Sequence, residues 1–382
     1  MAIKHKLRIL AYCSATSGGI AEYAVYQARA LQVAGAEVVC LTPPGHLHGR
    51  ATGVKKLERL PGLIPEGGSG WRKKISMALR IVGSQYSLAW QVLRRRPDLV
   101  LLDTYMEYLA PFWVWPHWFL ARVCGVRYAA TLHDPVRNYI VGPPWWHRFS
   151  VRLAYRPLDF VLVHHALPEP SPVPVGVGVV QVPHGLFEVN GVFDRYAVRH
   201  EWGIPPDAKV FLAFGYVRDA KNLAYAVRAL TQVPDAFLVV AGSLANAKEK
   251  PFSYYRERAA ECGVPARCRF FDGFVPDAEL GKYFAAADFV LLTYAASFHS
   301  QSGVLNVAAC ARKPILASAA PSPLIEAVTR FQLGIAVPPD SPEAVIAGMR
   351  QLLSAPPTPR WDEYEASASW SVNARKILEM VG

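Results

Sequence analysis

The chain has 382 residues, of which 52% are hydrophobic, and a formal net charge of +11 at pH 7. This length and composition predict a globular protein with two domains of ordinary size, and they exclude an intrinsically disordered chain. No apolar run in the sequence is long enough for a membrane-spanning helix, and the six cysteines have no metal-ligand spacing.

The first half of the chain alternates strands with helices. We expect strands over residues 7–13, 37–42, 99–103, 128–133, 160–164 and 179–183, and helices over 20–33, 71–95, 107–123 and 146–155. The apolar run near the amino terminus is short and alternates as a strand does. We therefore interpret it as the first strand of a cytoplasmic protein and not as a signal peptide.

Basic residues are concentrated in the first half. Residues 71–96 contain seven Lys or Arg residues and no Asp or Glu, and apolar residues recur there at helical spacing. The stripe consists of Ile75, Leu79, Val82, Tyr86, Trp90 and Leu93. Such a helix can either pack its stripe on a sheet or lie on an anionic membrane surface. Tryptophan-rich segments over 109–120 and 144–148 favour membrane contact by the first half. Nucleic acid is not expected as a partner, because no recognised nucleic-acid motif occurs.

A second series of strands and helices begins near Phe193. We expect strands over 210–216, 237–241, 268–271, 289–292, 315–317 and 334–337, with helices beginning at Leu223, Tyr254, Asp277, Gly303, Pro323 and Pro342. Two such series predict an α/β protein of two Rossmann-like domains, whose parallel sheets face an inter-domain cleft. We place the domains at 1–192 and 193–361, with a closing helix over 362–382 that packs back on the first.

Two loops carry glycine or cationic residues at strand ends. Gly18 and Gly19 follow the first strand, where they can either form a tight turn or let the backbone approach a ligand. Arg218 and Lys221 follow the first strand of the second domain. Two cations at that edge suit a diphosphate, although a solvated pair that caps a helix is the alternative.

A third loop precedes the helix expected at Gly303. Ser302 and Gly303 lie at its start, where backbone N–H groups and the helix dipole favour a phosphate. An ordinary strand–helix connection with a glycine cap explains the same pattern.

His133 ends a strand in the segment TLHDP, next to Asp134. A histidine there can bind the transferred group, act as a general base, or cap the loop with Asp134 as its partner. His164, His165 and His184 show similar but weaker patterns. A metal site from these histidines is a further alternative, although their spacing matches no recognised set of metal ligands.

Taken together, these segments resemble glycosyltransferase family 4, retaining enzymes of the GT-B fold, over nearly the whole chain. The similarity rests on SGGIAEYA, TLHDP, FGYVRDAKN, GFVPDAELGKYFAAADFVLLTY, SQSGVLNVA and KPILAS, and on Trp370 in the closing helix. SQSGV is similar to the loop of a QSGV-type subgroup.

The resemblance implies roles for individual residues. It implies His133, Arg218 and Lys221 as catalytic residues, and Gly19, Arg218, Lys221, Ser302, Gly303 and Val304 as ligands of the donor diphosphate. It implies Phe274 and Val275 near the nucleoside, where we add Glu326, and Gly18, Glu22 and Asp134 on the acceptor side. No metal and no cofactor other than the nucleotide-sugar donor are implied.

The sequence departs from the family pattern around the last loop. Many members have two acidic residues there, eight positions apart, and the second binds the donor ribose. The equivalent positions are His299 and Val307, so Glu326 is our substitute for the ribose ligand. Asn222 and Arg312 stand where the family has glycine.

The resemblance implies a retaining, metal-independent hexosyltransferase. We expect transfer of a hexose-type sugar from a nucleoside-diphosphate sugar to a glycan or lipid-linked acceptor, in bacterial polysaccharide or glycoconjugate synthesis. The first domain would bind the acceptor on the inner face of the cytoplasmic membrane, and the second would bind the donor. The alternatives are an inactive GT-B nucleotide-sugar-binding protein and a GT-B nucleotide-sugar epimerase.

Overall fold

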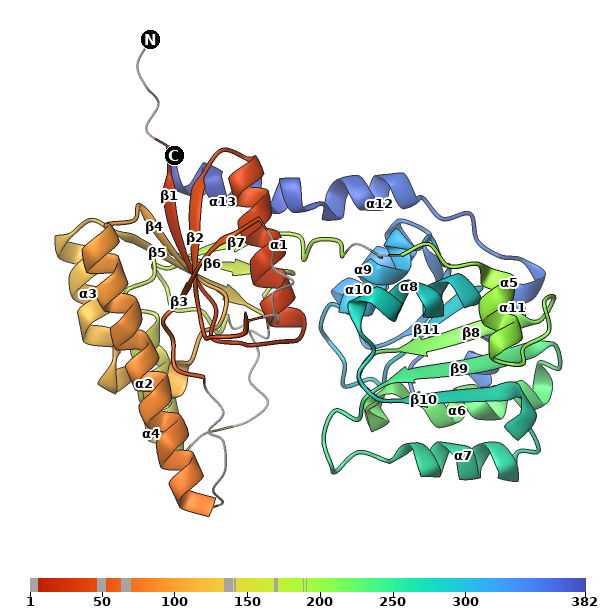
Figure 1. Cartoon of the computed structure of the whole chain (residues 1–382). Helices are drawn as coiled ribbons and strands as arrows, with labels where there is room; N and C mark the ends of the chain where they lie inside the picture. Colours follow the sequence, from red (N-terminus) through yellow and green to blue (C-terminus); the bar gives the residue numbers. More distant parts are fainter. Residues whose placement is uncertain are drawn as a thin grey trace, which may run out of the picture. The chain divides into compact units, whose positions relative to one another are not determined.

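The computed structural model describes residues 6–46, 53–62, 70–133, 140, 142–167, 171–187, 189 and 191–382 (Figure 1). The chain forms two compact units. Unit 1 comprises Met1–Gly185 and Ala368–Gly382, and unit 2 comprises Leu186–Ser367. The division after Gly185 lies seven residues before the boundary that we placed at 192 from the sequence.

Unit 1 is built on a seven-stranded parallel sheet. Its strands are β1 (Arg8–Tyr12), β2 (Glu37–Thr42), β3 (Lys55–Glu58), β4 (Leu99–Leu102), β5 (Arg127–Leu132), β6 (Phe160–Val163) and β7 (Gly178–Gln181). They lie in the order β3-β2-β1-β4-β5-β6-β7, so the winding reverses between β1 and β4. β3 was not expected, because its sequence KKLE lacks the apolar pattern of a strand.

Helices cover both faces of this sheet. They are α1 (Gly19–Val33), α2 (Gly70–Arg95), the 3-10 helix η2 (Glu107–Phe112), α3 (Val114–Val123), α4 (Pro144–Ala154) and α13 (Trp370–Val381). Successive residues of a strand point to opposite faces. Ile9 and Ala11 of β1 therefore pack in the core with α1 and α13, whereas Leu10 and Tyr12 pack in the core with α2, α3 and α4.

The long helix α2 exposes the apolar stripe that its sequence contains. The residues that it buries are Ser84, Gln85, Leu88, Ala89 and Val92. Ile75, Leu79 and Trp90 are 50%, 67% and 60% exposed. The prediction that this stripe packs on the sheet is therefore wrong. Among the members of the stripe, Val82 is the one that packs partly against the core. Across the described ranges, no helix is long and apolar enough to cross a membrane.

Unit 2 contains a six-stranded parallel sheet. Its strands are β8 (Lys209–Phe214), β9 (Ala236–Gly242), β10 (Cys268–Asp272), β11 (Phe289–Thr293), β12 (Ile315–Ser318) and β13 (Gly334–Val337). Their order is β10-β9-β8-β11-β12-β13, so the winding reverses between β8 and β11. All strand pairs of both sheets are parallel, as predicted.

The helices of unit 2 also lie on two faces (Figure 1). They are α5 (Arg195–Glu201), α6 (Leu223–Ala229), α7 (Phe252–Glu261), α8 (Asp277–Ala286), α9 (Gly303–Cys310), α10 (Pro323–Arg330), α11 (Pro342–Ser354) and α12 (Trp361–Ala368), with short 3-10 helices η3 (Asp219–Lys221), η4 (Leu230–Gln232) and η5 (Pro265–Arg267). One core is formed by α6, α7 and α11 against Phe211 and Ala213 of β8.

Two helices expected from the sequence are each divided in the structure. The segment 107–123 forms η2 and α3, because Pro111 interrupts a continuous α-helix. The closing segment forms α12 and α13. Tyr364 of α12 donates a 2.6 Å hydrogen bond to Asn306 within unit 2, whereas Asn373 of α13 donates to Tyr23 within unit 1.

Candidate functional site

The winding reversal of the unit 2 sheet lies between the two loops that carry the predicted phosphate ligands. In parallel sheets, ligands bind beyond the carboxyl ends of the strands at such a reversal, because the adjacent loops diverge there. The loop after β8 carries Arg218 and Lys221, and the loop after β11 leads to Ser302 and Gly303 at the start of α9. The fold therefore places these four residues in the segments that follow two neighbouring strands.

Lys221 is held by both of these strands. Its side chain is 9% exposed, and Nζ donates a 2.6 Å hydrogen bond to the carbonyl oxygen of Phe214 at the end of β8. The Lys221 carbonyl oxygen accepts a 2.9 Å hydrogen bond from Thr293 Oγ1 at the end of β11. Arg218, the N-cap residue of η3, is exposed. The loop thus combines a fixed, buried cation with an exposed one.

The charge state of Lys221 is adjustable. Burial, and then the nearby charge of Arg218, lower the pKa of Lys221 to about 7. An anion beside Nζ would favour the protonated form and raise this pKa. The ammonium group can therefore gain its proton when an anionic ligand arrives.

The start of α9 is held by aromatic contacts. The Ser302 hydroxyl forms a 2.9 Å hydrogen bond with the Tyr294 hydroxyl. Ser302 is the N-cap residue of α9, but its side chain makes no capping hydrogen bond to the helix. The Tyr294 ring stacks on Phe298 with ring centroids 3.9 Å apart. Gly303, the first residue of α9, is exposed, so the N-terminal N–H groups of the helix begin at the protein surface.

Gly215 lies where the two loops meet. A Cβ atom on this residue would lie 3.4 Å from Val304 Cγ2 and 3.6 Å from Lys221 Nζ. Its φ of +86° also requires a glycine. Val304 of α9 and Lys221 of the β8 loop therefore flank the same point of the backbone. Two of the predicted diphosphate residues, Lys221 and Val304, thus lie close together.

The predicted nucleoside residues lie on two other loops of this edge. Phe274 and Val275 follow β10, and Phe274 is 64% exposed. Glu326 is an exposed residue in the first turn of α10, after β12. β10 and β12 lie on opposite sides of the winding reversal.

The two positions that are acidic in many relatives differ in exposure. Val307 is buried in α9, whereas His299 is exposed in the β11 loop. The carboxylate of Asp340, which we did not single out from the sequence, accepts hydrogen bonds from Asn222 Nδ2 at 2.9 Å and from the Ala296 backbone N–H at 2.8 Å. It ties the β8 loop to the β11 loop.

Both departures from family glycines occur at positive φ. Asn222 has φ +53° and Arg312 has φ +50°. Asparagine tolerates this left-handed region better than most residues, whereas arginine adopts it at a steric cost. The structure thus gives a backbone reason for a glycine at both positions.

In unit 1, the turn after β1 carries Gly18, Gly19 and Glu22. Gly18 is the N-cap residue of α1, with φ +82° and ψ −179°, a region open only to glycine. Gly19 begins α1, and the Glu22 N–H donates to the Gly18 carbonyl oxygen at 3.1 Å. The turn lies beside the winding reversal between β1 and β4. Asp134, predicted on the acceptor side, lies outside the described residues.

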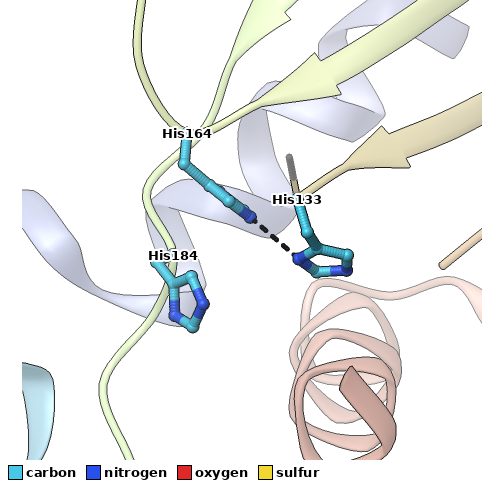
Figure 2. Close-up of side chains that lie close together, drawn as sticks. All are labelled: His133, His164 and His184. Atoms are coloured by element: carbon cyan, nitrogen blue, oxygen red, sulfur yellow. Dashed lines mark hydrogen bonds between the residues drawn. The ribbon is translucent and has the colours of Figure 1, made fainter. Parts of the chain in front are cut away.

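Three histidines meet at the carboxyl ends of β5, β6 and β7 (Figure 2). His133, His164 and His184 each offer a ring nitrogen, and these three atoms all lie within 4.8 Å of one another. His164 Nε2 lies 3.4 Å from His133 Nδ1. The sequence spacing of these histidines gave no indication of a common site, but neighbouring strands bring them together.

These histidines are packed around Tyr23 of α1. The Tyr23 ring lies 4.9 Å from the His133 ring and 5.3 Å from those of His164 and His184, measured between centroids. Burial lowers the pKa of His164 well below its usual value, and the charges of His184 and His133 lower it further. Burial, followed by His133, lowers the pKa of His184 to about 3. Both rings are therefore neutral at pH 7.

A buried carboxyl group lies at the reversal in unit 1. Asp103 directly follows β4 and is 1% exposed, and Thr131 Oγ1 donates a 3.2 Å hydrogen bond to its Oδ1. Burial raises the pKa of Asp103 to about 7. We had assigned this residue only to the end of a strand. An acidic residue directly after a buried apolar strand was the signal that could have identified it.

The carboxyl-terminal part of the chain matches a known protein family. Residues 194–377 match the family model for glycosyl transferases group 1, which covers most of unit 2 and part of α13. No curated protein sequence matches the chain.

Solved structures resemble the whole chain. Sucrose-phosphate synthase from Thermosynechococcus elongatus is 17% identical, with a TM-score of 0.70 over 98% of each chain. A glycosyltransferase from Rickettsia africae ESF-5 is 15% identical, with a TM-score of 0.71 over 99% of this chain and 98% of that one. HepE from Anabaena, in complex with UDP and glucose, is 15% identical, with a TM-score of 0.71 over 98% of this chain and 99% of that one. The chain has the GT-B fold, which confirms the prediction of this fold with two parallel sheets.

Proposed function

We propose that this protein is a retaining glycosyltransferase that uses a nucleoside-diphosphate sugar as its donor. The observation that carries the proposal is the convergence of Lys221 and α9 at Gly215, beside the winding reversal of unit 2. The group 1 family match over residues 194–377 supports it. HepE, a structural relative, binds UDP and glucose, which supports a donor of this class.

The cations of unit 2 suit a departing diphosphate. When the bond between the sugar and the diphosphate breaks, negative charge develops on the leaving oxygen, and fixed positive groups lower the energy of that state. Lys221 and Arg218 would supply two full charges, and the start of α9 would add N–H donors near Gly303. This charge balance lets the proposed reaction proceed without a metal ion.

Retention follows from attack on the face that the leaving group vacates. The bond from the anomeric carbon to the diphosphate oxygen breaks, and the acceptor oxygen bonds to the same face of that carbon. The departing phosphate oxygen takes the proton of the acceptor hydroxyl, so no separate carboxylate nucleophile is needed. In this scheme His133 of unit 1 hydrogen-bonds to the sugar and orients it.

The donor experiment starts from nucleotide binding. Thermal-shift measurements with UDP, GDP and ADP identify the base, because a ligand that binds the folded state raises the melting temperature. Incubation with the matching hexose donors then tests for release of nucleoside diphosphate. Product analysis distinguishes transfer from epimerisation. Nucleotide binding without turnover, for any hexose donor and with added glycan and lipid-linked acceptors, would contradict the proposal in favour of a binding protein.

We further propose that the acceptor is a glycan or a lipid-linked sugar at the inner surface of the bacterial cytoplasmic membrane. The exposed stripe of α2 supports this, because it pairs apolar side chains with basic ones on a helix that has no acidic residue. Exposed aromatic residues continue on the neighbouring elements η2, α3 and α4. They are Phe112, Trp115, Trp118, Phe119, Trp145 and Phe149.

Flotation with anionic lipid vesicles tests the membrane surface. The wild-type protein should float at low salt and detach as salt increases, since surface attraction is screened. The triple variant Ile75→Ser, Leu79→Ser, Trp90→Ser should lose most of the binding. Val33→Ser is the matched control, because Val33 is 90% exposed on α1, away from the stripe. Equal flotation of the triple variant and the control would contradict the proposal.

A further inference from the structure

The three histidines of unit 1 have the separation of ligands to one ion. A tetrahedral Zn²⁺ has Zn–N bonds of about 2.0–2.1 Å, which place two of its nitrogen ligands about 3.3 Å apart. His164 Nε2 and His133 Nδ1 are 3.4 Å apart, which is long for an ordinary N–H···N hydrogen bond and close to that ligand separation. Ligand nitrogens of all three histidines lie within 4.8 Å of one another, so His184 is the third candidate ligand.

A backbone carbonyl orients one of these rings. His164 Nδ1 lies 3.3 Å from the carbonyl oxygen of Val182. A carbonyl that accepts from one ring nitrogen leaves the other nitrogen with its lone pair. A histidine that binds a metal through one ring nitrogen usually donates a hydrogen bond from the other, as to a backbone carbonyl.

Aromatic residues pack against the cluster, whose three histidines are each partly exposed. Tyr23 is fully buried, and its hydroxyl accepts hydrogen bonds from Gln27 at 2.9 Å and from Asn373 at 3.0 Å. The Trp370 ring lies 5.0 Å from the Tyr23 ring and directly against Gly185, where an added Cβ would lie 2.1 Å from it.

We propose that His133, His164 and His184 form a binding site for a divalent transition-metal cation, for which Zn²⁺ is the best fit. Imidazole nitrogens suit Zn²⁺ and its neighbours and not Mg²⁺ or Ca²⁺, which require oxygen ligands. Three protein ligands leave a fourth position open to water or an anionic oxygen. One consequence rests on the proposed function: an ion that holds His133 withdraws it from the sugar, so Zn²⁺ inhibits transfer.

Cobalt is the direct probe, because four-coordinate Co²⁺ has intense visible absorption bands. Untagged full-length protein is titrated with Co²⁺, and we expect bands that saturate at one equivalent and disappear when Zn²⁺ is added. His164→Gln and His184→Gln should each weaken Co²⁺ binding at least tenfold. His165→Gln is the control, because His165 adjoins His164 in sequence but its Nδ1 contacts the Ala166 carbonyl oxygen at 3.0 Å. It should bind as the wild type does.

The outcomes separate the metal site from the proposed enzyme. Wild-type protein without Co²⁺ bands at one equivalent overturns the site, whether or not the variants fold. Unchanged Co²⁺ binding in a folded His164→Gln, His184→Gln double variant also overturns it and leaves the histidines as packed aromatic rings. Inhibition by Zn²⁺ is assayed separately. A protein that binds Co²⁺ but transfers no sugar contradicts the proposed function alone.

Discussion

The two sheets reverse their winding at equivalent places but present different chemistry there. In unit 2, the loops after β8 and β11 supply Lys221, Arg218 and the start of α9, all suited to an anion. In unit 1, the carboxyl ends of β4 to β7 supply a buried Asp103 and three closely packed histidines. The comparison teaches that topology locates a ligand edge, whereas the loops determine which ligand can bind there.

The two sites also differ in how far apart their residues lie in the sequence. The cationic pair of unit 2 lies within four residues of sequence, so a short motif encodes it. The histidine cluster of unit 1 extends from His133 to His184, and only the sheet brings it together. Experiments that alter each edge separately can therefore test whether the two edges have different functions.

The largest expected effect comes from removing the cations of unit 2. Arg218→Ala with Lys221→Ala should weaken binding of the nucleoside diphosphate and lower kcat/KM by roughly 10²–10⁴-fold, since each charged hydrogen bond contributes about 1.5–3 kcal/mol. Isothermal titration and a turnover assay measure this. The matched control is Arg228→Ala on α6, which removes an exposed ion pair with Glu343. An equal loss of binding and turnover in that control would contradict a specific role for Arg218 and Lys221.

A second effect is a pH dependence of diphosphate binding at the unit 2 edge. Lys221 has a pKa near 7, so above neutral pH the free site loses the proton that a diphosphate needs. The dissociation constant should rise about tenfold per pH unit above 7, with uptake of about one proton on binding. Titrations in buffers of different ionisation enthalpy measure this uptake. Lys221→Met should bind more weakly and without the steep dependence, and a steep dependence in that variant would assign it to another group.

A third effect concerns the glycine turn of unit 1. Gly18→Ala should lower the free energy of unfolding by about 1–3 kcal/mol, because alanine is strained at φ +82°. Gly19→Ala, one residue later, should instead stabilise the protein by about 0.4–1 kcal/mol, since α1 has begun and its added Cβ meets open space. Urea-unfolding midpoints compare the two. Equal shifts of the two unfolding midpoints would mean that the backbone at position 18 does not require a glycine.

The smallest effect concerns the corresponding turn of unit 2. Asn222→Ala should cost about 1–2 kcal/mol, because alanine lacks the Asp340 contact and is strained in the left-handed region. Asn222→Gly loses the same contact without the strain, so its unfolding midpoint should lie between those of Asn222→Ala and the wild type. A midpoint for Asn222→Gly at or below that of Asn222→Ala would show that backbone strain does not govern this turn.

Much of the fold could be predicted from the sequence. Alternating apolar strands and amphipathic helices indicated two parallel α/β sheets, because each period of hydrophobicity fits one kind of element. The charged strand β3 was not predicted, because it forms through its pairing with β2 and not through an apolar pattern of its own. The helix pair η2 and α3 was merged in the prediction, because the apolar pattern continues across Pro111 while the backbone does not.

The stripe of α2 shows the limit of periodicity. Its spacing correctly indicated an amphipathic helix, but periodicity does not say which face the protein covers. The sheet covers the face of Leu88 and Val92, so Leu79 and Trp90 are left exposed. Which face is buried depends on the neighbouring elements, and these lie far away in the sequence.

The sequence by itself determined the α/β class and the unit 2 motif around Arg218 and Lys221, because both depend on nearby residues. Only the tertiary structure decided that Val304 and Lys221 meet at Gly215, and that three histidines from separate strands have their nitrogens within 4.8 Å. The physical reason is the same in both cases. Parallel pairing aligns the ends of strands that are distant along the chain, and side-chain contacts at that edge depend on strand order.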